Sequence, residues 1–397
     1  MTRLLPMASS AEIPALANCA WLYTGAEGPP LAAQAEALTR YLANRALASA
    51  GRDAHAEVEA SLRRRLAAIL GYDVADIALV SNAGEAMNLV AHSLELQPGD
   101  NVVVNDLEFP SVVQPWLRLA GQGIEVRVAR HSGTELKAAD IVSLLDDRTR
   151  VLAFSHVSYQ SGLRQDVEAL SAAAAETGAL VLLDATQSLG ALPVPADLAD
   201  VVVCSSYKWL LGGHGLGILA WNRARRPFPE PPSVGWRSVA DTFAADRYQR
   251  YHLHDDARRF EIGFPSYPTI YALDTSVAWL SKFDADAVRD HILALSGRLV
   301  AELAGRGYEL LTPAEPARRS GNVSVRAARG AELAGYLAAQ GIHCWGGDGR
   351  IRASVHLFNS DDDIDRLLAA LAGAPPQLRP GNDVPATSAP LTGGDSA

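Results

Sequence analysis

Cysteine is scarce in this sequence, with three residues, Cys19, Cys204 and Cys344, among 397. They form no Cys-x-x-Cys pair and cannot build a disulfide framework. No run approaches the roughly 18 apolar residues that are needed to span a bilayer. Residues 1–11 carry one early Arg and no long apolar core, so a secretory signal is not expected. These absences predict a cytoplasmic protein with no membrane partner.

Positive charge is also in short supply, because 35 Lys and Arg residues stand against 45 Asp and Glu, which gives a net charge of −10. Such a balance argues against nucleic acid as the main partner. The basic run at 63–65 lies in a helical pattern with Glu57 and Glu59, which favours a solvated helix face. A hydrophobic share of 48% is normal for a globular protein, and the length suits one large domain with a smaller companion.

Short apolar segments alternate with helix-like segments over most of the chain. Several are rich in Val and continuously apolar, which is typical of parallel strands with helices on both faces of the sheet. Only nine residues, 207–215, separate the last two segments, too few for a helical crossover, so the last strand is predicted to be antiparallel. The sequence therefore predicts an α/β fold with a seven-stranded, mostly parallel sheet, with strands at 77–82, 101–106, 125–130, 151–157, 180–185, 201–206 and 216–221.

The C-terminal part of the chain has a different pattern. Amphipathic helices at 272–282 and 287–305 precede a strand at 322–326, and then a helix, a strand pair and a final helix at 361–372 follow. This predicts a smaller α+β domain. The expected division is an N-terminal arm that joins the small domain (1–28), a large domain (29–270), the small domain (271–374) and a disordered tail (375–397), which has little to bury.

Small and acidic residues occur where two predicted strands end. Residues 81–86 close one strand and open a helix, so that backbone N–H groups can approach an anion such as phosphate. A plain turn is the commoner reason for such a segment. Asp184 ends the apolar run 180–183, and a buried carboxylate needs a partner. A protonated pyridine nitrogen is one such partner, although an Asp at a strand end is more often a helix cap.

Lys208 follows the buried strand 201–206, a position where lysine is seldom found unless it is paired or used. Desolvation and a neighbouring cation would lower its pKa and free the amine for imine formation. Ser205 and Tyr207 supply hydroxyl groups that suit a phosphate. Together, a phosphate cradle, an Asp and a Lys at the strand ends of one sheet point to a pyridoxal 5′-phosphate (PLP) enzyme.

The stretches 184–187 and 205–212 resemble the class V aminotransferase family of fold-type I PLP enzymes. That family includes cysteine desulfurases, selenocysteine lyases and isopenicillin N epimerase-like proteins. Further matches lie at 155–158, 259–263 and 351–354, and the resemblance covers roughly residues 18–373. It implies a PLP cofactor, an amino-acid substrate and a homodimer with shared active sites. No metal is expected.

The resemblance also implies roles for individual residues. Lys208 would carry the cofactor as an aldimine and move the substrate proton, and Asp184 would pair with the ring nitrogen. Gln187 would bond the ring's phenolic oxygen, and Arg352 would hold the substrate α-carboxylate. The remaining expected contacts are Ala83, Gly84, Ser205, Tyr207 and Ser266 for the phosphate, Phe109 stacked on the ring, and Tyr159 and His156 on the substrate side.

Some positions depart from the family pattern. Phe109 stands where relatives often have His, and a Phe can stack on the ring but cannot donate a proton. Phe264 stands where many relatives have a Thr that reaches the partner subunit's phosphate, so either Ser266 or Tyr267 takes over or the contact is lost. The cradle at 83–84 has only backbone donors, whereas desulfurases commonly have hydroxyl residues there.

A desulfurase needs a mobile thiol, expected near residues 347–349 by resemblance to the family's small-domain loop. Cys344 lies a few residues too early and Cys204 lies within a strand, so both are expected to be packed thiols. A desulfurase is therefore disfavoured. The intact set of Asp184, Gln187, Lys208 and Arg352 in turn disfavours a binding protein that has lost catalysis.

The remaining reactions stay open. The loop 346–349 and the aromatic residues Trp236, Tyr267 and Trp345 would admit a bulky S-conjugated cysteine. C–S β-elimination and O₂-dependent decarboxylation with oxidative deamination are both expected alternatives, with epimerisation and transamination after them. The Ala-, Leu-, Arg- and Asp-rich composition resembles that of high-GC bacteria with specialised metabolism. The chain also resembles the S-conjugate-processing enzymes of lincosamide-type antibiotic biosynthesis.

Overall fold

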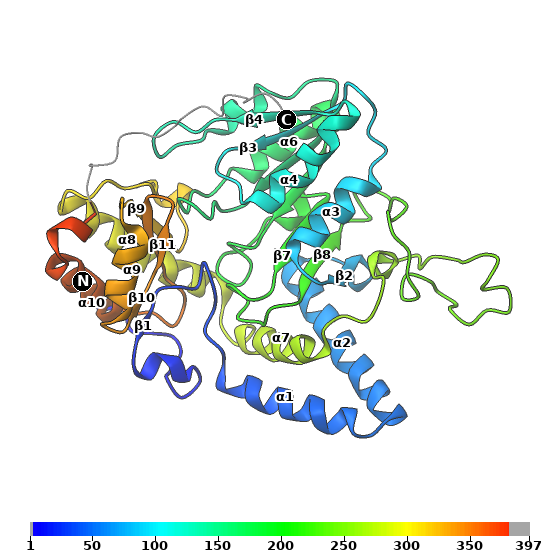
Figure 1. The fold of residues 1–397 in the computed structure, drawn as a ribbon, viewed down its shortest axis with the longest axis horizontal. Coiled ribbons are helices and arrows are strands. Elements are labelled where there is room, and N and C mark those ends of the chain that lie inside the picture. The colour runs from blue at the N-terminus through cyan, green and yellow to red at the C-terminus, as the bar shows by residue number, and fades with distance from the viewer. Residues whose placement is uncertain (1–2, 381–397) are drawn as a thin grey trace, which may run out of the picture.

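The computed structural model describes residues 3–380, and its large domain is built on a seven-stranded sheet of order β2-β8-β7-β6-β5-β3-β4 (Figure 1). The last strand pairs antiparallel with both of its neighbours, whereas all other pairs are parallel. The predicted fold is confirmed. The strands are β2 (Ile77–Val80), β3 (Asn101–Asn105), β4 (Glu125–Ala129), β5 (Thr149–Ser155), β6 (Leu180–Asp184), β7 (Val201–Ser205) and β8 (Gly217–Trp221).

Alternate residues of the central strands enter two different cores, one on each face of the sheet. On β7, Val202 packs into one core and Val203 into the other. Helices α2 (Ser49–Leu70), α6 (Val167–Thr177) and α7 (Tyr267–Leu280) contribute to the first core, and α3 (Ala83–Ser93) and α4 (Pro110–Leu119) to the second. Each fully buried Val or Leu contributes about 1.5–3 kcal/mol to the free energy of folding. The two cores therefore fix the strands, and with them the residues at the strand ends. Helices α1 (Ala32–Arg45) and α5 (Ala138–Val142) complete the domain.

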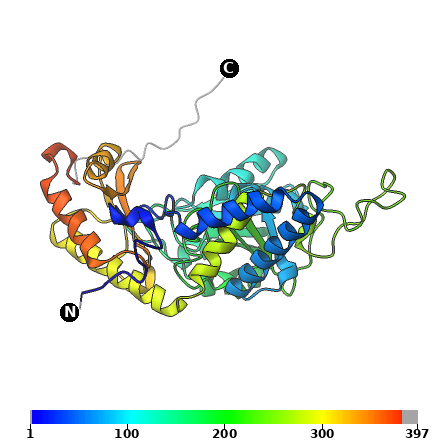
Figure 2. The same cartoon turned by 90° about the horizontal axis from the view of Figure 1, so that it is seen from below.

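The small domain contains the antiparallel sheet β11-β12-β9, made of β9 (Asn322–Arg326), β11 (Trp345–Gly347) and β12 (Arg350–Ser354). The N-terminal residues join it, because β1 (Ala20–Trp21) pairs with β10 (Ile342–His343). Figures 1 and 2 show this N-terminal segment beside the C-terminal helices. Helix α7 packs against α1 and α2, which places it beside the large sheet. The small domain's helices are α8 (Ala285–Gly305), α9 (Gly330–Ala338) and α10 (Asp361–Gly373).

The C-terminal tail predicted to be disordered (375–397) begins with a short 3₁₀ turn at Pro376–Leu378, and residues 381–397 lie outside the described part of the chain. Within the described residues, no helix is both long enough and apolar enough to cross a membrane. The proposed division into an arm, two domains and a tail remains a prediction.

Candidate active site

Parallel strands β5, β6 and β7 end at one edge of the large sheet, and the candidate residues lie there. Strand β7 ends at Ser205, and the chain then turns tightly before β8 begins. The Ser206 hydroxyl closes this turn by donating to the carbonyl oxygens of Gly213 at 2.6 Å and Leu216 at 2.8 Å. Lys208 lies within the turn and is only 8% exposed. A lysine held this way has little freedom to move its amine into solvent.

The environment of Lys208 favours its neutral form. Burial, followed by the positive charge of Arg352, lowers the pKa of Lys208 to about 8, against the opposite pull of Asp184. The Nζ atom lies 5.4 Å from the ring centre of Phe109 and 5.7 Å from that of Tyr207. The amine is therefore flanked by aromatic faces and is reactive near neutral pH, as condensation with an aldehyde requires.

Asp184 provides the test of whether this site fits PLP. It ends β6, is 5% exposed, and accepts a hydrogen bond from the Thr186 backbone N–H at 2.7 Å. Burial raises the pKa of this carboxyl group. A buried carboxylate without an ion-pair partner is costly, and a protonated pyridine nitrogen would compensate it. The residues present therefore fit the cofactor.

Gln187 is held by three neighbours. Its side-chain oxygen accepts from Trp209 Nε1 at 2.9 Å and from Asn322 Nδ2 at 3.0 Å, and its amide nitrogen donates to the Gly25 carbonyl at 2.9 Å. One N–H of the amide is left to reach the cofactor, so the predicted bond to the phenolic oxygen stays a prediction. The contacts also show that Gln187 ties together the large domain, the small domain and the N-terminal segment.

The predicted phosphate cradle begins helix α3. The Asn82 side chain caps the helix by accepting from the Glu85 N–H at 2.8 Å, so the amides of Ala83 and Gly84 have no intrahelical acceptor and suit an anion. Ser205 is buried and Tyr207 is half-buried, both close to Lys208 in sequence. Their contacts with phosphate remain predictions.

Ser266 is the N-cap of α7, and its hydroxyl lies 2.8 Å from that of Thr269, which donates to the His214 carbonyl. Tyr267 is engaged elsewhere, because its hydroxyl donates to Glu59 at 2.9 Å. Of the two candidates to replace the family Thr, Ser266 is thus the freer one. Its role at the partner subunit's phosphate is a prediction that rests on the dimer.

Arg352 lies on β12, and its guanidinium donates to the Tyr159 carbonyl. Burial and the adjacent Arg350 lower the pKa of Arg352 to about 10. The Tyr159 ring contacts the Phe109 ring edge-on at 5.1 Å. The structure thus links Phe109, Tyr159 and Arg352 beside Lys208, as the predicted substrate side requires.

His156 is fully buried beyond the end of β5, and burial, aided by Arg164, lowers its pKa to about 3. Its imidazole is therefore neutral, and its backbone N–H donates to the Asp184 carbonyl at 2.9 Å. The structure gives it a place in the sheet edge, and its predicted contact with substrate remains untested.

Two residues at this edge, Glu108 and Gly25, were not assigned from the sequence. Glu108 accepts from the Ser155 N–H at 2.9 Å and from the Asn105 amide at 2.5 Å, and burial raises its pKa to about 7. It joins the ends of β3 and β5 next to Phe109. Gly25 faces Arg352, because a Cβ added there would lie 3.2 Å from the Arg352 guanidinium carbon. An acidic residue beside the predicted stacking residue was the available signal for Glu108, whereas Gly25 has no comparable signal in sequence.

Comparison with known proteins agrees with this geometry. The family described as aminotransferase class-V matches residues 30–367. A probable cysteine desulfurase of Pseudomonas aeruginosa is 31% identical over 75% of this chain and 77% of its own length. A probable cysteine desulfurase of Methanothermobacter thermautotrophicus is 27% identical over 90% of this chain and 94% of its own length. The solved complex of the cystine C-S lyase C-DES with cysteine persulfide has a TM-score of 0.84 at 24% identity, covering 93% of this chain and 100% of that chain.

An α/β sheet with a lysine and an aspartate at its strand ends, arranged as here, defines a PLP enzyme of fold type I. The chain belongs to the class-V aminotransferase family, and PLP is its cofactor. The structural likeness to C-DES supports the fold alone. These two sequence relatives conflict with one expectation, because both are named as probable cysteine desulfurases, and the cysteine positions disfavour that reaction here.

Proposed function

We propose that the enzyme cleaves the C–S bond of an S-substituted cysteine by β-elimination. The observation that carries this proposal is the shape of the segment before Arg352. Strands β11 and β12 pair with Gly347 opposite Arg350, which leaves Asp348 and Gly349 as a two-residue turn. Both have positive φ, 45° and 68°, as in a type I′ hairpin. A turn this short has no room for a mobile segment that carries a cysteine.

Neither Cys344 nor Cys204 fills that gap. Cys344 precedes the hairpin, is 6% exposed, and has its pKa raised to about 12 by burial, which Arg352 only partly offsets. Cys204 lies in β7, and burial raises its pKa as well. Since the thiolate is the attacking form of cysteine, neither thiol is prepared to remove sulfur from a substrate. This supports the prediction that the desulfurase reaction is disfavoured, despite the names of the relatives.

The site residues suit elimination. When bound, PLP supplies the electron sink that stabilises negative charge at the substrate Cα. Arg352 would hold the α-carboxylate, and Lys208 would remove the α-proton. Phe109 cannot exchange a proton, so Lys208 is the group that moves it on this side of the site. Electrons of the broken Cα–H bond form the Cα–Cβ double bond as the thiolate leaves, and hydrolysis of the released product gives pyruvate and ammonium.

Oxidative deamination with loss of CO₂ is the alternative for the same substrates, and a place in specialised metabolism remains a prediction. Product analysis separates the reactions. With S-alkyl cysteines, we expect pyruvate, ammonium and thiol in equal amounts. Alanine with protein-bound sulfur, formed from free L-cysteine, would instead support a desulfurase, and CO₂ with an aldehyde, formed from the S-alkyl cysteines, would support the oxidative route. If none of these products forms from varied S-conjugates, the substrate class is wrong.

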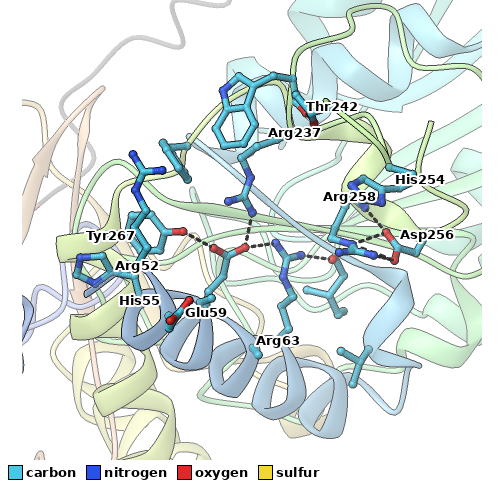
Figure 3. A pocket seen from close by; sticks show the side chains of 18 of the residues that line it. Arg52, His55, Glu59, Arg63, Arg237, Thr242, His254, Asp256, Arg258 and Tyr267 are labelled. Carbon is cyan, nitrogen blue, oxygen red and sulfur yellow. Dashed lines mark hydrogen bonds and ion pairs between the residues drawn. The ribbon is translucent and has the colours of Figure 1, made fainter. Parts of the chain in front are cut away.

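We also propose that the enzyme works as a homodimer. An open hollow of about 1850 Å³ lies between α2 and the segment 236–258, and Lys208 is not among its lining residues. Figure 3 shows Glu59 in this hollow between Arg63, Arg237 and Tyr267. Burial alone would raise the pKa of Glu59, but the two guanidinium groups outweigh it and lower that pKa.

The segment beside the hollow extends away from the body of the molecule (Figures 1 and 2). Its aromatic side chains are exposed, by 84% for Phe243 and 86% for Tyr248. Exposed aromatic groups next to a large hollow are typical of an interaction surface. A second copy of the chain would cover them and bring Ser266 towards a second active site.

A further inference from the structure

The two faces of the small sheet contact different parts of the molecule. Ile351 and Ala353 point into the core of the small domain. Because side chains alternate along a strand, Arg350 and Arg352 share the opposite face. That face meets the large domain, since Arg352 donates to the Tyr159 carbonyl and Ser324 Oγ donates to the Gln160 carbonyl at 2.6 Å. Arg350 therefore points to the same side as Arg352, which is predicted to hold the substrate α-carboxylate. Along the strand it lies two residues beyond Arg352 as counted from Ser354.

Arg350 is a buried cation with little compensation. Its side chain is 5% exposed, and among the described residues its Nε has no hydrogen-bond partner. Its contact with a carboxylate is long, 3.4 Å to Asp348, whose own side chain is 70% exposed. Burying a guanidinium with so weak a partner is costly, so the position calls for an anion from outside the chain.

Two aromatic rings hold the Arg350 guanidinium in place. Its central carbon lies 4.6 Å from the ring centre of Trp345 and 5.4 Å from that of Tyr159. Stacking on aromatic faces fixes the plane of the group and leaves its edge N–H donors free for a two-pronged bond to a carboxylate. Tyr159 in turn contacts Phe109, which places Arg350 on the substrate side of the site. Arg352 lies between Arg350 and Lys208, because it is Arg352 whose charge acts on the Lys208 amine.

The neighbouring charges do not offset Arg350. Arg352 is two residues away on the same face, about 7 Å along the strand, and the two guanidinium groups repel each other. Arg326, which pairs with Arg350 across the strands, is already bound by Glu309 at 2.6 Å. Arg352 and Arg350 thus form a doubly positive site in which a single α-carboxylate compensates only one charge.

We propose that Arg350 binds a second anionic group of the substrate, carried at the far end of its sulfur substituent. The substrate class is then a dicarboxylic S-conjugate of cysteine, with the α-carboxylate on Arg352 and the distal carboxylate on Arg350. The identity of the sulfur-containing part rests on the proposed function. The recognition of a distal anion rests on the two arginines alone.

The test compares two substrates that differ in one charge, S-(2-carboxyethyl)-L-cysteine and its neutral amide, S-(3-amino-3-oxopropyl)-L-cysteine. With the wild-type holoenzyme, we expect kcat/KM for the acid to exceed that for the amide about 10- to 100-fold, as for a charged hydrogen bond. In Arg350→Gln this preference disappears, mainly through KM for the acid, while kcat/KM for the amide falls much less than that for the acid. Arg350→Lys should keep a smaller preference for the acid over the amide. This variant provides the test if Arg350→Gln does not fold.

Two outcomes overturn the proposal. One is an absence of preference for the acid in the wild-type enzyme. The other is an equal loss for acid and amide in Arg350→Gln, which would show that Arg350 serves the α-carboxylate or the hairpin. Calorimetry with the sulfur-free analogue 2-aminopimelate separates this proposal from the reaction. If Arg350→Gln weakens the binding of 2-aminopimelate but not that of 2-aminoheptanoate, which lacks the distal carboxylate, the anion site stands even if no C–S bond is cleaved; equal effects on the two analogues, or none on either, contradict it.

Discussion

Lys208→Ala should lower the rate of C–S cleavage by about 10⁴-fold or more, because it removes both the covalent anchor of the cofactor and the group that moves the α-proton. Phe109 has no proton to exchange, and the thiols of Cys204 and Cys344 are buried and held in the neutral form. The variant should also lose the absorbance of covalently bound PLP, which sodium borohydride would otherwise bleach.

Controls for Lys208→Ala separate lost chemistry from lost structure. Its circular dichroism and its mass in solution should match those of the wild-type protein, with a mass of two chains for both. A wild-type mass of one chain would contradict the shared-site proposal, while leaving the role of Lys208 untouched. If the folded variant keeps wild-type activity, the assignment of Lys208 is wrong.

Asp184→Asn should have opposite effects on the two forms of the protein. With cofactor, it removes the charge that pairs with the ring nitrogen, and breaking a buried ion pair costs about 3–5 kcal/mol, which corresponds to about 10²- to 4 × 10³-fold in activity if the whole cost falls on the reaction. Without cofactor, the carboxylate is a buried charge without an ion-pair partner, so the variant should be more stable than wild type. The amide oxygen can still accept the Thr186 N–H bond, so geometry is kept.

The pH dependence of the apoprotein gives an independent check on Asp184. Burial raises the pKa of Asp184 in the folded state, so the unfolded chain loses this proton first as the pH rises. The folded apoprotein is therefore destabilised at neutral pH, and this penalty is absent below about pH 4, where both states are protonated. The stability gain of Asp184→Asn should follow the same trend. A stability gain of Asp184→Asn that is independent of pH, or a stability loss at neutral pH, would contradict the view that Asp184 is an unpaired buried carboxylate in the apoprotein.

Much of the fold was predictable because local patterns and tertiary structure agree in the large domain. All seven strands lie within one or two residues of their predicted bounds, since most of them are short apolar runs followed by a polar end. The antiparallel direction of β8 followed from the short connection before it. Lys208 and Asp184 were accessible for the same reason, because strand ends in a parallel sheet converge at one edge.

The residues that were missed depend on register and on contacts between distant segments. Arg350 reads in sequence as an ordinary polar residue of an alternating strand, and only the pairing of β12 with β9 and β11 shows that its face meets the active site. Gly25 reaches Arg352 through the path of the N-terminal segment, which has no periodic pattern. The absence of room for a mobile thiol also became clear only from the hairpin geometry at Asp348 and Gly349.

The central claim is that the C–S bond is cleaved without a protein thiol. The most direct measurement is pyruvate release from an S-alkyl cysteine by Cys344→Ala, alongside the wild-type enzyme and with mass spectrometry of each protein during turnover. The account predicts that the two rates agree within about twofold, because the buried, neutral thiol takes no part in the reaction, and that neither protein carries added sulfur. A variant that folds normally but loses turnover, together with a wild-type chain that gains sulfur on Cys344, would contradict it.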